Sequence, residues 1–134
     1  MTRFDTFVLV DWSGGNQGPA QPRADAIWAC VARGAEVLPP VYLRHRQAAE
    51  AWLTDTIAAE RAAGRRVLAG FDFPFGFPAG FAAAATGSAE PFALWYWFAP
   101  RVDDSPTANN RFALAGEINR RFGGHGPFWG NASR

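Results

Sequence analysis

The chain has very little cysteine and no lysine. Cys30 is the one cysteine among 134 residues, and a single thiol excludes an internal disulfide framework and a multi-cysteine zinc site. All 13 basic residues are arginine, and 12 acidic residues nearly balance them to a net charge of +1. A balance this even argues against a polycationic nucleic-acid-binding protein, which would carry a marked basic excess.

Long apolar runs are also missing. The N-terminal segment holds only four consecutive apolar residues before Asp11, too few for a signal peptide or a membrane span. We therefore expect a cytoplasmic protein with no membrane partner. Aromatic residues, in contrast, make up 15% of the chain and concentrate in its second half. That half is expected to be partly buried or to stack on another molecule.

The first half of the chain predicts four strands and one helix. The first strand is a nearly continuous apolar run, typical of a buried central strand. The third is interrupted at Pro39-Pro40, which favours an edge position. The order β-β-β-α-β predicts an α/β domain in which an antiparallel meander is extended by a crossover. The predicted strands span residues 6–12, 25–32, 36–43 and 67–73, and the predicted helix spans 46–63.

The second half shows no clear strand. Its spacing predicts helices over 78–85 and 91–99, and a third from a cap at Thr107 or Asn109 through Arg121. We expect one domain over 1–134, with a core over 1–74 and a helical, aromatic-rich extension over 75–134. The unperiodic end of the sequence favours the interpretation that the chain is the front portion of a longer protein.

Two apolar strands each carry an aspartate at the C-terminal end, Asp11 in VLVDWSGG and Asp72 in LAGFDFPFGFP. A right-handed crossover would make these strands parallel and adjacent. Neighbouring strands lie about 4.8 Å apart, so both carboxylates would reach one divalent cation at the edge where open sheets bind ligands. Either aspartate alone is explained by capping of the following turn, but the pair favours a functional site.

The element order and the paired aspartates resemble the ribonuclease H-like superfamily. The strings VDWSGG and GFDFPFGFP are similar to those of uncharacterised bacterial proteins described as RNase H-like nucleases. The resemblance implies that Asp11 and Asp72 hold Mg²⁺ or Mn²⁺, which stabilises the attacking and leaving oxygens of a phosphodiester. It therefore implies a metal-dependent hydrolase of nucleic acid or a nucleotide, and the near-neutral charge favours the nucleotide.

The resemblance also implies a third acidic ligand. Glu50, near the start of the predicted helix, lies at the same sheet edge as Asp11 and is the candidate, although a solvated place on the helix flank explains it equally simply. Glu60, near the opposite end, is expected to be structural and to pair with Arg65 or Arg66. The superfamily's last catalytic acid lies on a helix beyond a fifth strand, and the sequence indicates neither element. The remaining acidic candidates are Asp103, Asp104 and Glu117.

Two groups of residues suit a phosphate. Ser13 and Gly14, in the turn after Asp11, are similar in placement to the phosphate-binding turn of actin-like ATPases, which share the core fold. That interpretation predicts a non-catalytic or ATP-binding module, and a plain hairpin turn explains the same residues. The cluster Asn109-Asn110-Arg111 opens a predicted helix and suits a phosphate or carboxylate, although capping and a surface arginine account for it as well.

The aromatic residues after Asp72 leave a third function open. Phe75, Phe77 and Trp97 belong to a segment that would stack a nucleobase or form the core of a helical cap. If their rings are exposed, the chain is instead an interaction domain that binds a partner or forms a homodimer.

Overall fold

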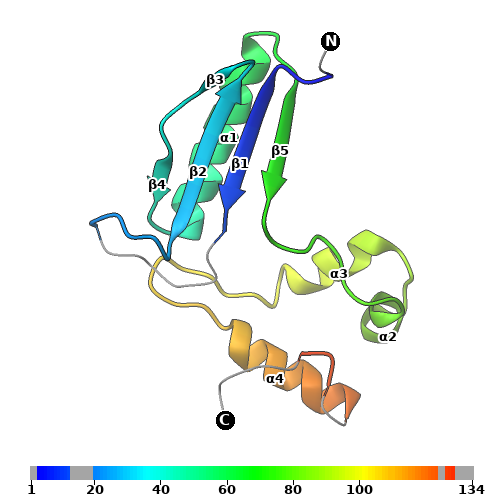
Figure 1. Cartoon of the computed structure of the whole chain (residues 1–134). Helices are drawn as coiled ribbons and strands as arrows, with labels where there is room; N and C mark the ends of the chain where they lie inside the picture. The colour runs from blue at the N-terminus through cyan, green and yellow to red at the C-terminus, as the bar shows by residue number, and fades with distance from the viewer. Residues whose placement is uncertain (1–2, 13–19, 124–125, 129–134) are drawn as a thin grey trace. The chain divides into compact units, whose positions relative to one another are not determined.

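The computed structural model describes residues 3–12, 20–123 and 126–128. The chain divides into two compact units, Met1–Phe73 and Pro74–Arg134. Figure 1 shows the sheet and the longest helix in the first unit and three helices in the described part of the second. Within the described ranges, no helix is long and apolar enough to cross a membrane.

The first unit is built on a five-stranded mixed sheet. Its order is β3-β2-β1-β5, and β4 pairs with β2 beside β3. The central strand β1 is antiparallel to β2 and parallel to β5, so the predicted α/β class and central first strand are confirmed. The strands are β1 (Thr6–Asp11), β2 (Ile27–Arg33), β3 (Glu36–Val37), β4 (Val41–Leu43) and β5 (Val67–Phe71).

The third predicted strand is broken where its two prolines stand. β3 pairs with Ala32 and Arg33 at one end of β2, and β4 pairs with the other end, Ile27–Ala29. Proline has no N–H to donate to a sheet, so Pro39-Pro40 separates two short edge strands that share one neighbour. The predicted interruption is therefore confirmed.

One face of the sheet packs against α1 (Arg46–Ala62), as Figure 1 shows. Side chains alternate along β1, so that Val8 and Val10 are buried while Leu9 on the other face is 59% exposed. The apolar run predicted burial on both faces, and for Leu9 that prediction is wrong because the helix covers only the face of its neighbours. The core on the helix side contains Val8, Val10, Ile27, Ala29, Val31, Leu43 and Ala49, with Trp52 and Leu53 packed against it.

The two ends of α1 are set by short-range chemistry. The Nδ1 atom of His45 accepts a hydrogen bond from the Ala48 N–H at 3.2 Å and caps the first turn, a role the sequence did not indicate. Gly64 follows the helix with φ of +72°, the left-handed conformation that favours glycine. The predicted end of the helix is therefore confirmed.

The carboxylate of Glu60 ties the C-terminal end of α1 to the sheet. Glu60 is 1% exposed and accepts hydrogen bonds from Thr6 Oγ1 at 2.6 Å and Arg33 Nη2 at 2.7 Å. Arg65 also pairs with it, so the predicted structural role and that pairing are confirmed. Arg66 pairs with Asp5 instead, at 3.2 Å. Hydrogen bonds from Arg65, Arg33 and Thr6 hold the pKa of Glu60 well below its ordinary range.

The second unit has its own core, made by helices α2 (Phe81–Thr86), α3 (Pro91–Phe98) and α4 (Arg111–Phe122). Two of the predicted starts are wrong. α2 begins at Phe81 rather than Pro78 because Gly80 takes φ of +84°. α4 begins at Arg111 with Asn110 as its N-cap, one residue after the nearer of the two predicted caps, Asn109. The core residues are Phe81, Ala85, Leu94, Leu114 and Ile118.

Replacing the buried carboxylate tests the cluster around Glu60. Glu60→Gln is expected to lower the free energy of unfolding by about 2–3 kcal/mol at pH 7, because it leaves two arginines without their counter-charge. The loss stays near the low end for buried pairs because both arginine side chains are more than one-third exposed to water. Urea denaturation followed by circular dichroism measures it, with exposed Asp55→Asn on the same helix as control. Equal losses in the two variants would contradict a stabilising role.

The lowered pKa of Glu60 also predicts a pH dependence. Its folded-state pKa lies below the unfolded value of roughly 4.3, so its contribution is complete above that pH and declines as pH falls towards the folded-state pKa. The stability difference between the native chain and Glu60→Gln should therefore shrink between about pH 4 and pH 3. Denaturation at a series of pH values checks this, since other carboxylates cancel in the difference. A difference that grows on acidification would show the opposite linkage.

Candidate functional site

The parallel pairing of β1 with β5 brings the two candidate aspartates together. Val10 stands opposite Phe71 in the register, so Asp11 and Asp72 follow one step further along their strands. Side chains alternate between faces, which places both aspartates on the face of Leu9, away from the core residues Val8 and Val10. Both side chains are exposed, and the predicted adjacency of the two strands is confirmed.

The two carboxyl groups interact directly. A hydrogen bond with Asp72 raises the pKa of Asp11, and desolvation and the negative charges of Asp72 and Asp25 raise it further. Asp72 has a second partner, since its Oδ1 accepts a hydrogen bond from the Trp12 N–H at 2.7 Å. One carboxylate is therefore held by the backbone of the strand that carries the other.

Aromatic rings surround this backbone contact. The Trp12 ring meets Phe71 edge to face at 6.2 Å between ring centroids, and Phe73 at 5.7 Å. Phe71 and Phe73 lie on either side of Asp72 in the chain, and their rings are 5.1 Å apart. The rings fix the segments that leave β1 and β5, and so fix the Trp12 N–H that holds Asp72.

Asp25 is a third acidic residue at this edge, and the sequence interpretation missed it. It lies two residues before β2, and because β2 is antiparallel to β1, the start of β2 meets the end of β1. Its charge contributes to the raised pKa of Asp11. The sequence could have indicated Asp25, because the predicted antiparallel meander already places the start of the second strand beside the end of the first.

The described residues hold no group of three or more His, Cys, Asp or Glu side chains placed to bind one metal ion. Glu50, the expected third ligand, is exposed on α1 and does not form such a group with Asp11 and Asp72. Ser13 and Gly14, the expected phosphate-binding turn, lie outside the described residues.

The cluster Asn109-Asn110-Arg111 lies in the second unit, where its amides serve the local backbone. The Asn110 side chain accepts a hydrogen bond from the Asp103 N–H at 3.0 Å and donates one to the Arg101 carbonyl at 2.8 Å. The Asn109 Oδ1 accepts from the Arg111 N–H at 3.2 Å. Arg111 lines an apolar pocket. Loop and helix-start contacts therefore account for both asparagine side chains.

The donor set at the end of β1 and β5 fits a hard divalent cation. Carboxylate oxygens are the ligands that Mg²⁺ and Mn²⁺ prefer, and Mg²⁺ commonly binds through only one or two carboxylates and keeps several waters. A dication at the two adjacent, exposed carboxylates would replace their repulsion by attraction. Asp11 and Asp72 are the residues that would hold it.

Removing one of the two charges is expected to stabilise the metal-free chain. The pKa of Asp11 is raised in the folded state, so its ionised form costs stability at neutral pH, and the cost disappears when the group is protonated at low pH. Asp11→Asn should raise the free energy of unfolding by about 0.5 kcal/mol at pH 7, the size usual for exposed charge pairs. Denaturation in EDTA at pH 7 and pH 4 measures the gain, with Asp55→Asn as control. A variant less stable than the native chain at pH 7 would contradict the predicted repulsion.

Comparisons with known proteins found no match for this chain. No protein-family model matches the chain. Searches of curated proteins and of solved structures likewise found no match. The site is therefore defined by its own residues, namely two neighbouring carboxyl groups at the ends of adjacent parallel strands, with Asp25 as a third acidic residue that influences Asp11.

Proposed function

We propose that the chain is a metal-dependent phosphodiester hydrolase of the ribonuclease H-like kind, with Mg²⁺ or Mn²⁺ held by Asp11 and Asp72. One observation carries the proposal: the parallel register of β1 and β5 places Asp11 and Asp72 side by side at the C-terminal ends of adjacent strands, where the interaction with Asp72 raises the pKa of Asp11. In open α/β sheets this edge is where ligands bind. The substrate is nucleic acid or a nucleotide, and the net charge of +1 favours the smaller ligand.

The described residues have separate roles in this proposal. The Trp12 N–H donates a hydrogen bond to Asp72 Oδ1 and so orients the Asp72 carboxylate before any cation binds. Asp11 supplies the second carboxylate. Asp25 adds negative potential at the same edge, which raises the local concentration of cations. The bound ion would supply charge stabilisation for the attacking and leaving oxygens of a phosphodiester.

The raised pKa of Asp11 supports a functional reading of this edge. Adjacent carboxylates without a neutralising partner are uncommon at purely structural positions, because their repulsion lowers stability. Glu60 in the same unit shows the structural alternative, since two arginines and a hydroxyl neutralise it. Among the described residues, no ion pair between Asp11 and an arginine plays that part.

Binding of Mn²⁺ to the metal-free chain tests the site first. Asp11→Asn and Asp72→Asn should each weaken binding about tenfold or more, which corresponds to about 1.4 kcal/mol. Asparagine keeps the oxygen that accepts from the Trp12 N–H, so Asp72→Asn removes the charge while the local hydrogen bond remains. Asp25→Asn, acting only through space, should weaken binding about twofold. Electron paramagnetic resonance of free Mn²⁺ measures each affinity.

Controls on α1 separate this site from general surface charge. Asp55→Asn removes one exposed carboxylate and should leave Mn²⁺ affinity unchanged. Glu50→Gln should do the same, because Glu50 forms no three-ligand group with the two aspartates. Native affinity in Asp11→Asn would overturn the metal site.

Hydrolysis is the second arm of the experiment. With Mn²⁺ present, the native chain should cleave bis(4-nitrophenyl) phosphate or a cyclic nucleotide, and both aspartate variants should lose that activity with the fold retained. Metal binding without cleavage of either compound, or of a labelled oligonucleotide, would reject the hydrolase while leaving the metal site in place. Stabilisation by nucleotide without cleavage would favour the ATP-binding alternative.

A further inference from the structure

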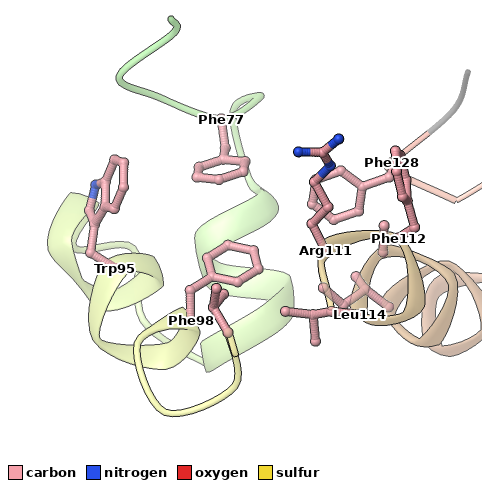
Figure 2. Close-up of a pocket in the computed structure, with 10 residues that line it drawn as sticks. Phe77, Trp95, Phe98, Arg111, Phe112, Leu114 and Phe128 are labelled. Carbon is pink, nitrogen blue, oxygen red and sulfur yellow. The ribbon is translucent and has the colours of Figure 1, made fainter. Parts of the chain in front are cut away.

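The second unit contains an apolar pocket of about 480 Å³. Its floor belongs to the core of that unit, since Leu114 and Ile118 contribute to both. Figure 2 shows Phe77, Trp95 and Phe98 on one side of the space and Arg111, Phe112 and Leu114 on the other. The volume lies in the range of small-molecule sites.

Half of the lining residues are aromatic, and several of their rings pack against one another. Phe77 stacks on Phe98 at 5.4 Å between ring centroids and meets Trp95 at 6.3 Å and Phe128 at 6.4 Å. These contacts hold one wall in place before a ligand arrives, so binding would cost little side-chain entropy.

Several of the lining residues remain open to solvent although they are large and apolar. Trp95 and Phe112 are 44% and 48% exposed, and Phe77 and Val102 are more than one-third exposed. An apolar body seated in the pocket would remove this surface from water, which is the main favourable contribution to binding at such sites.

Arg111 is the one charged side chain among the described lining residues. Its guanidinium lies 4.6 Å from the centre of the Phe112 ring, and within the described part of the chain no carboxylate forms an ion pair with it. A cation beside an apolar pocket, without an internal counter-charge, is complementary to a ligand with one anionic group.

The same lining argues against a nucleobase. Each base carries several hydrogen-bonding groups along its edges, and a buried polar group without a partner costs binding free energy. Apart from Arg111, the indole N–H of Trp95 is the only polar side-chain group among the described residues of the lining. The pocket therefore favours a body without polar edges.

We propose that this pocket binds a small amphipathic anion, with an apolar ring-bearing body among the aromatic side chains and a single carboxylate or sulfonate group paired with Arg111. The proposal is independent of the carboxylates in the first unit. Its ligand class is defined by two features together: the apolar lining, which accepts the body, and the single cation, which accepts the head group.

A charged and an uncharged probe of similar shape test the two features separately. We expect 1-anilinonaphthalene-8-sulfonate to bind saturably to the full chain, and N-phenyl-1-naphthylamine, which lacks the sulfonate, to bind more weakly. Arg111→Gln should weaken binding of the sulfonate about fivefold or more and leave the neutral probe within about twofold. Arg121→Gln, an exposed arginine on the same helix outside the pocket, should change neither. Fluorescence titration measures the affinity of each of the two probes for the native chain and for both variants.

A second pair of variants tests the location. Ala115 lines the pocket, and Ala115→Trp should fill it and abolish binding of both probes. Ala113→Trp adds the same side chain at an exposed position of α4 and should preserve both. Far-ultraviolet circular dichroism confirms that each variant is folded. Unchanged binding in Ala115→Trp would overturn the proposed location.

Competition decides the class of ligand. 1-Naphthoate should displace the sulfonate probe, whereas adenosine monophosphate should do so at least about tenfold less effectively, because its base edges find no partners in the lining. Stronger competition by the nucleotide would overturn the ligand class. Native affinity for the sulfonate in Arg111→Gln would overturn the role of the cation.

Discussion

The parallel pairing of β1 with β5 is the constraint on which the first unit depends. Two parallel strands cannot be joined by a tight turn, so the chain must cross over the sheet between them, and α1 is that crossover. The same pairing aligns the strand ends. It places Thr6, at the start of β1, near the C-terminal end of α1, where its hydroxyl donates a hydrogen bond to Glu60. It places Asp11 beside Asp72 at the opposite ends of the same strands.

The carboxylates at the two ends of strand β1 have opposite electrostatic surroundings. At one end Glu60 is buried, and its charge is neutralised by Arg33, Arg65 and a hydroxyl, so its pKa falls. At the other end Asp11 is exposed, and its nearest charged neighbours are acidic, so its pKa rises. The first arrangement stabilises the fold, whereas the second stabilises it only if something positive is added. This contrast within one sheet is the physical basis for proposing a function at the strand ends that carry Asp11 and Asp72.

The second unit separates apolar and polar roles in a different way. Its rings and aliphatic side chains form a core that stays incomplete at the surface, where Arg111 lines a pocket and, among the described residues, has no carboxylate as an ion-pair partner. The neighbouring asparagines are used for the loop that precedes α4. In the cluster Asn109-Asn110-Arg111, the two asparagine side chains therefore form hydrogen bonds with the local backbone, whereas the Arg111 side chain lines the pocket.

Local sequence patterns predicted much of the secondary structure and the order of its elements. Alternation and apolar runs predicted the strands, and the prolines at 39 and 40 predicted the broken edge strand. The expected crossover predicted that Asp11 and Asp72 stand at the ends of neighbouring parallel strands. The starts of α2 and α4 were predicted wrongly, because the backbone of Gly80 and the side-chain bonds of Asn110 depend on neighbouring segments.

Only the tertiary structure decided which partners each side chain acquired. The roles of Arg33 as a partner of Glu60 and of Asp25 as a neighbour of Asp11 come from the packing of elements that are separate in the chain. Burial shows the same limit, since Leu9 belongs to an apolar run yet is exposed beside buried Val8. A sequence specifies the alternation of side chains along a strand. Contacts between elements determine which face of the strand is buried and which charged groups lie near its ends.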